Sequence, residues 1–106
     1  MPSATYSVLR SAVVARSRVS ATYKSQLRFF CPHLIGTKDG EEHVLAYMFG
    51  GGSVSRPVEP VGSEANWRCF VVSELMNVRL INGAWCTADD YSVADQSCVD
   101  VVDKAV

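Results

Sequence analysis

The stretch LRFFCPHLIGTKDGEEHVLAYMF, residues 27–49, decides the fold of this chain. In its first part, residues 27–32 predict a strand in which Leu27, Phe29 and Cys31 alternate with other residues and so share one face. The Asp39-Gly40 pair in the middle favours a tight hairpin, because these residues tolerate the positive backbone angles of such turns. Apolar and aromatic residues then fill 43–49, which predicts a further strand with both faces covered.

Similar patterns flank this stretch on both sides. Residues 19–23 predict a strand that joins the next one through a short turn, and residues 67–72 and 78–80 resume the strand pattern. Between them, residues 50–66 are rich in glycine, serine and proline, which predicts a long mobile loop. We expect residues 95–106 to form a final edge strand or an extended arm.

A helix is predicted at the start of the chain, over about residues 4–15. Ser3 is a suitable N-cap, and apolar residues recur on one side of the expected helix. A chain of 106 residues is long enough for one core and too short for two. We therefore expect one mainly β domain, either a small SH3-like or Sm-like barrel or a strongly curved antiparallel sheet. It covers about residues 18–88, and an arm over 89–106 follows it.

Bulk composition excludes a disordered or nucleic-acid-coating protein, since 48% of the residues are apolar, 20% are charged and the net charge is -1. The charges are nevertheless unevenly placed. Residues 1–38 carry +6 and no acid, whereas residues 39–106 carry all eleven acids and a net -7. Two interpretations follow: a basic face for an anionic partner, or acids near the C-terminus that fold back on the basic segment and neutralise it.

No secretory signal or membrane-spanning stretch is recognisable, so a cytoplasmic protein with no membrane partner is expected. The four cysteines are then expected to be reduced and structural. No Cys-x-x-Cys pair occurs, and structural zinc sites normally have paired ligands, so we expect no metal.

Motifs of catalysis are also missing from the sequence. Three glycines at 50–52 lack the lysine and the helix of a phosphate-binding loop. We expect His33 and His43 to be surface or turn residues and Cys69 to be a small buried apolar residue. No enzymatic activity and no cofactor are expected.

The order of short motifs resembles that of the WYL domain, an Sm-like or SH3-like β-barrel of bacterial regulators. The motifs are Pro32 after an early strand, Ala46-Tyr47 at the end of another, Arg68-x-Phe70, and Leu75. The Trp-Tyr-Leu tripeptide itself falls on Glu42-His43-Val44, and Glu74 replaces an arginine. The resemblance spans about residues 18–81 and describes a divergent, stand-alone member of the family.

This resemblance implies a ligand-sensing or regulatory interaction module that binds a nucleotide or a nucleic acid through basic and aromatic residues. The residues that it suggests for ligand binding are Arg68, Tyr47, His43 and Arg28. The alternative is a structural homo-oligomer of Sm-like barrels, joined through exposed edge strands and without a small ligand.

Arg68 has two competing interpretations of its own. It alternates with Phe70 and Val72 along one strand, so it must either reach the rim of the sheet or meet a negative group. The negative group could belong to an anionic ligand or to Glu41, Glu42 or Glu74.

Overall fold

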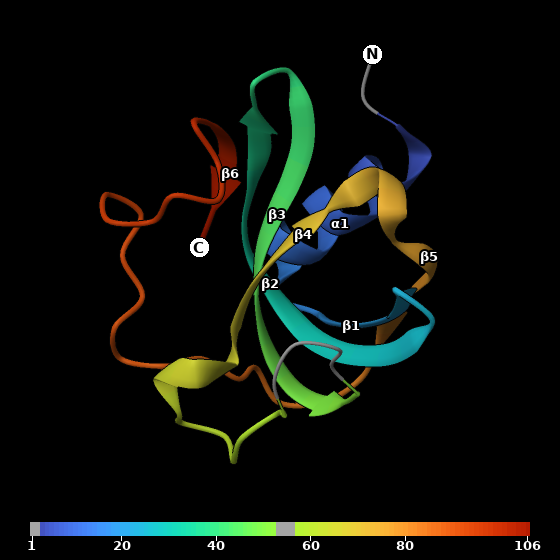
Figure 1. The fold of residues 1–106 in the computed structure, drawn as a ribbon, viewed down its shortest axis with the longest axis vertical. Coiled ribbons are helices and arrows are strands. Elements are labelled where there is room, and N and C mark those ends of the chain that lie inside the picture. The colour runs from blue at the N-terminus through green and yellow to red at the C-terminus, as the bar shows by residue number, and fades with distance from the viewer. Residues whose placement is uncertain (1–2, 53–56) are drawn as a thin grey trace.

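A computed structural model describes residues 3–52 and 57–106 (Figure 1). Six strands, one α-helix and two short 3-10 helices are formed by these residues. In chain order they are α1 (Ala4–Ala15), β1 (Arg18–Tyr23), β2 (Gln26–Lys38), β3 (Glu41–Gly51), η1 (Glu64–Asn66), β4 (Trp67–Val71), η2 (Val72–Glu74), β5 (Met76–Ile81) and β6 (Val101–Ala105). No helix among them is long and apolar enough to cross a membrane.

The strands form one antiparallel sheet in the order β4-β3-β2-β1-β5, and β6 pairs separately with β2. Figure 1 shows β2 and β3 as a long, strongly twisted hairpin at its centre. Both turns that flank β2 have the positive φ angles of tight hairpins, 52° and 63° at Lys24-Ser25 and 52° and 79° at Asp39-Gly40. The mainly β fold with a curved antiparallel sheet and one N-terminal helix is confirmed.

Helix α1 begins where the sequence predicts. The Oγ of Ser3 accepts a hydrogen bond from the backbone N–H of Tyr6 at 3.1 Å and donates one to Oε1 of Glu42 at 2.7 Å. The helix buries the predicted apolar side against the sheet through Tyr6, Leu9, Ala12 and Val13. It ends at Arg16, whose φ of 52° is left-handed.

The two faces of the central hairpin are covered by different parts of the chain. Alternate residues of β3 point to opposite faces, so Val44, Ala46 and Met48 join the core under α1. Tyr47 instead lies in a second cluster with Cys31, Trp67, Trp85, Cys86 and others. The segment after β5 covers this second face. Both faces of the hairpin are therefore covered, as the sequence predicts.

Strand β6 is the final strand predicted for the C-terminus, and it pairs with residues 34–37 of β2, where Gly36 lies opposite Val102. A Cβ atom at Gly36 would collide with the backbone oxygen of Val101 and lie 2.6 Å from Cγ1 of Val99. The absence of a side chain at Gly36 therefore allows the C-terminal segment to approach β2 closely. This contact brings residues 90–100 alongside β3 and β4, where they form one wall of a groove.

Candidate functional site

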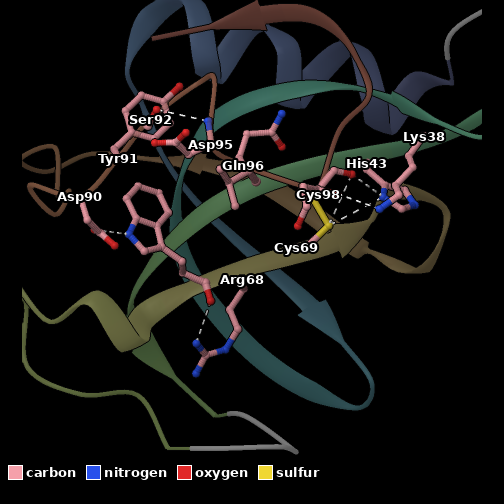
Figure 2. Close-up of a pocket in the computed structure, with 13 residues that line it drawn as sticks. Lys38, His43, Arg68, Cys69, Asp90, Tyr91, Ser92, Asp95, Gln96 and Cys98 are labelled. Carbon is pink, nitrogen blue, oxygen red and sulfur yellow. Dashed lines mark hydrogen bonds between the residues drawn. A yellow bond between two sulfur atoms is a disulfide. The ribbon is translucent and has the colours of Figure 1, made fainter.

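A groove of about 600 Å³ lies between the β3–β4 surface and the segment 90–98 (Figure 2). Its size is in the range of small-molecule sites. The residues that line it are Lys38, His43, Leu45, Trp67, Arg68, Cys69, Asp90, Tyr91, Ser92, Asp95, Gln96, Ser97 and Cys98. Figure 2 shows aromatic rings at one end and a disulfide beside an imidazole at the other.

The aromatic end is built from Trp67 at the start of β4 and Tyr91 in the C-terminal segment. Their rings stack with centroids 5.5 Å apart and an interplanar angle of 25°. The indole Nε1 donates to Oδ1 of Asp90 at 2.8 Å, which fixes the orientation of the ring. Both aromatic side chains are half-buried, so each contributes ring surface to the groove wall.

Behind these rings lies His33, which is fully buried. Its Nδ1 lies 2.7 Å from the carbonyl oxygen of Cys31 and its Nε2 lies 2.8 Å from Oγ1 of Thr87. Since a carbonyl can only accept, Nδ1 carries the proton and Nε2 accepts from the threonine. Burial lowers the pKa of His33 to about 4. The expectation of a surface or turn position for His33 is wrong, because β2 continues through Pro32 into the interior.

The other end of the groove holds a disulfide between Cys69 and Cys98, whose Cα atoms are 5.5 Å apart. The expectation that all four cysteines are reduced is wrong for this pair, and Cys69 is exposed rather than buried. The two positions are 29 residues apart in sequence and are brought together when the C-terminal segment crosses the sheet. Cys31 and Cys86 are free and buried.

His43 lies directly beside this disulfide. Its Nδ1 is 2.9 Å from the carbonyl oxygen of Cys98 and 3.7 Å from Sγ of Cys69. Its Nε2 is 2.8 Å from Oε1 of Glu41. Of the residues suggested by the sequence, His43 is thus placed in the groove, and it is half-buried rather than a free surface side chain.

Arg68 also contributes to the groove lining, yet its guanidinium is directed away from Asp90, Tyr91 and Asp95 (Figure 2). Nη1 donates to the backbone oxygens of Ala65 at 2.5 Å and of Trp67 at 3.0 Å. These contacts fasten the segment just before β4.

Arg28 and Tyr47 do not line the groove. Arg28 is 3% exposed, its guanidinium carbon lies 5.5 Å from the centroid of the Tyr23 ring, and Nη2 donates to the Tyr23 carbonyl oxygen at 3.4 Å. Burial lowers the pKa of Arg28. The hydroxyl of Tyr47 donates to the carbonyl oxygen of Ser63 at 2.7 Å and accepts from the N–H of Gly62 at 2.8 Å.

Contacts like these hold the described part of the predicted loop 50–66, whose residues 53–56 lie outside the described residues. Besides Tyr47, the fully buried Asn66 ties the loop through Oδ1, which accepts from Glu59 N at 2.8 Å. Its Nδ2 donates to the Glu59 carbonyl oxygen at 2.7 Å. Tyr47 of β3 therefore fastens residues 62–63 to the sheet, and Asn66 joins the two ends of the segment 59–66 to each other.

The uneven charge distribution is partly neutralised within the chain. Arg10 on α1 pairs with Asp103 on β6, Nε to Oδ2 at 3.0 Å. Tyr6 donates to the same carboxylate oxygen at 2.7 Å, and this hydrogen bond, together with Arg10, lowers the pKa of Asp103. The C-terminal acids thus fold back on the basic segment at this contact, as the second interpretation of the charges predicts.

Several residues of the groove were not found from the sequence. Trp67 and Tyr91 lie 24 positions apart and were assigned to a strand and to an arm, with no sign that their rings would meet. The Cys69–Cys98 pair had a weak signal in the even number of cysteines. Neither pairing can be selected from the sequence, because each depends on the path that the C-terminal segment takes along the sheet.

No protein-family model matches the chain, and neither a curated protein nor a solved structure does.

Proposed function

We propose that this protein is a binding module that takes a nucleotide-sized ligand with a planar ring into the groove between β4 and the segment 90–98. The observation that carries the proposal is the groove itself, with a volume of about 600 Å³ and a stacked Trp67–Tyr91 pair in its wall. Aromatic ring surface of this kind stacks on flat ligands such as nucleobases.

The charges of the groove favour a small ligand over a nucleic-acid strand. Lys38 adds a cation to the lining, but Asp90 and Asp95 add two carboxylates. A nucleic-acid strand needs a row of available cations that follows its phosphates. Of the six bases in residues 1–38, four have partners within the chain. Arg10 is paired with Asp103 and Arg28 is buried, while Arg18 and Lys38 donate to backbone carbonyl oxygens.

The WYL resemblance implies the same class of ligand, a nucleotide. It differs in the residues that would contact the ligand. Instead of Arg28 and Tyr47, the proposal uses Trp67 and Tyr91, and it retains His43 as part of the groove lining.

Two variants of matched chemistry test the proposal. Ser97→Trp places an indole in the groove, since Ser97 is exposed and lines it; Ser73→Trp places the same side chain on the exposed η2 segment, outside the lining. Mass spectrometry of denatured protein identifies co-purified material, and calorimetry then measures binding of mononucleotides and of a single-stranded oligonucleotide at low salt. We expect mononucleotide binding by the parent and by Ser73→Trp, with loss in Ser97→Trp. Equal binding by both variants, or no binding by the parent, contradicts the proposal.

A second candidate is the homo-oligomer joined through an edge strand, and one observation favours it. Strand β5 ends the strand order, and its Met76 and Leu80 side chains are 63% and 49% exposed. Exposed apolar edge strands pair readily with another chain. Sedimentation of the parent and of a Met76→Lys/Leu80→Lys variant distinguishes the two candidates: a dimer that the lysines dissociate supports the oligomer, and a monomer at all concentrations excludes it.

A further inference from the structure

His43, Cys69 and Cys98 bring three side chains that can bind a metal ion together at one end of the groove. Their ligand atoms all lie within 4.8 Å of one another. One residue comes from β3, one from β4 and one from the C-terminal segment, so the cluster exists only in the folded chain. We propose that this cluster is a redox-controlled metal site: the Cys69–Cys98 disulfide is the closed form, and its reduction creates a Cys₂His site for Zn²⁺ or a similar thiophilic divalent cation.

The position of the imidazole supports this assignment. In tetrahedral zinc sites, Zn–S and Zn–N bonds of about 2.3 and 2.0 Å place a sulfur and a nitrogen ligand about 3.5 Å apart. Sγ of Cys69 and Nδ1 of His43 are 3.7 Å apart. A cation that binds both needs no movement of the β3 and β4 backbones, whose pairing places Leu45 opposite Cys69.

Glu41 gives the site the second contact that metal-bound histidines commonly have. The Nε2–H of His43 donates to Oε1 of Glu41 at 2.8 Å, which leaves Nδ1 on the sulfur side. Histidine ligands of metals usually donate their other ring N–H to a carboxylate or carbonyl, and this bond orients the ring. In the disulfide form, Nδ1 donates its own proton to the carbonyl oxygen of Cys98 at 2.9 Å; a bound cation takes the place of that proton.

Opening of the metal site requires a two-electron reduction of the Cys69–Cys98 disulfide. A dithiol reductant transfers two electrons and two protons to the Cys69–Cys98 bond, which becomes two thiols, and the reductant becomes a cyclic disulfide. Binding of Zn²⁺ then releases one proton from each thiol and the Nδ1 proton of His43 to the solvent, and the two thiolates and the neutral imidazole bind the cation. The exposed Cys69 offers the reductant access from the groove.

The other cysteine pair provides a matched control within the same chain. Cys31 and Cys86 are buried, and the backbone N–H of Cys86 donates to Sγ of Cys31 at 3.3 Å. Burial raises the pKa of the Cys31 thiol to about 11, so this thiol stays protonated at neutral pH. No imidazole among the described residues joins this pair in a metal-ligating group.

Cobalt spectroscopy on the full chain tests the site, with Co²⁺ as the probe and a trialkylphosphine as the reductant, because a dithiol would compete for the metal. We expect the reduced protein to bind one Co²⁺ per chain with thiolate charge-transfer bands and tetrahedral visible bands, and Zn²⁺ to abolish them. The oxidised protein should bind no Co²⁺. Glu41→Gln should weaken binding by about 10- to 100-fold, the usual effect of removing such a carboxylate.

Variants of the two cysteine pairs decide which thiols are responsible. Cys69→Ser should abolish the charge-transfer bands, whereas Cys31→Ala/Cys86→Ala should retain them. Alkylation mapping of the parent protein gives the same answer without any variant: Zn²⁺ should protect Cys69 and Cys98 in the reduced chain and leave Cys31 and Cys86 unaffected. Equal Co²⁺ binding before and after reduction, or protection of the other pair, overturns the proposal.

Discussion

Nη1 of Arg68 donates to the backbone carbonyl oxygen of Ala65, three residues earlier in the chain, at 2.5 Å. The same nitrogen donates to the carbonyl oxygen of Trp67 at 3.0 Å. The arginine that sequence reasoning offered as a ligand anchor therefore holds the backbone that leads into β4, at the aromatic end of the groove.

Replacement of Arg68 by alanine should lower the free energy of unfolding by about 2 kcal/mol, because two hydrogen bonds from a charged donor to the carbonyl oxygens of Ala65 and Trp67 are lost. Arg79→Ala, at an exposed position of β5, is the matched control and should change stability by less than about 0.5 kcal/mol. Urea titrations followed by circular dichroism measure both. An Arg68→Ala protein as stable as the parent but unable to bind a nucleotide would show instead that Arg68 is a ligand anchor.

Reduction of the Cys69–Cys98 disulfide in the absence of metal should lower the free energy of unfolding by about 3–4 kcal/mol. The crosslink closes a loop of 29 residues, and the loss of chain entropy in the unfolded state sets this magnitude. Denaturant midpoints with and without phosphine give the change, and Cys31→Ala/Cys86→Ala should show the same response. If intact mass shows two added hydrogens while the midpoint stays unchanged, the disulfide does not stabilise the fold.

Stability should fall as the pH decreases from 6.5 to about 4, through the protonation of His33. The pKa of His33 is lowered by burial to about 4 in the folded protein, so the unfolded chain binds more protons over this interval. The stability that neutral His33 contributes is fully present above pH 6.5 and amounts to about 3 kcal/mol of the free energy of unfolding. His33→Asn retains a donor for the Cys31 carbonyl and does not titrate, so its stability should vary less with pH. Identical pH profiles for the two proteins would contradict this role.

Gly36→Ala should release β6 from β2, because the added Cβ collides with the backbone of Val101. Gly50→Ala is the matched control, since a Cβ at that strand position meets Phe29 at 3.4 Å, an ordinary contact. Amide hydrogen exchange measures the effect: residues 101–105 should lose protection in the first variant and keep it in the second. Retained protection in Gly36→Ala would show that β6 tolerates a side chain there.

Local sequence patterns predicted the secondary structure well, for identifiable physical reasons. The Ser3 cap and the apolar spacing specify α1, because capping and helical periodicity act within a few residues. Asp39-Gly40 specifies the β2–β3 hairpin through the positive φ angles that it tolerates. The expected strand at 27–32 was too short, since β2 runs from Gln26 to Lys38. The register shift between Pro32 and Leu34 accommodates the proline within this longer strand.

By itself, the sequence determined the helix, the hairpins and a mainly β fold with two covered faces, because turn chemistry and side-chain periodicity are local properties. The tertiary structure alone decided which distant side chains meet: Cys69 with Cys98, Trp67 with Tyr91, and His43 with the disulfide. These contacts depend on the path of the chain after β5 and on the pairing of β6 with β2 at Gly36. That path is selected by packing against the whole sheet, and no short-range pattern encodes it.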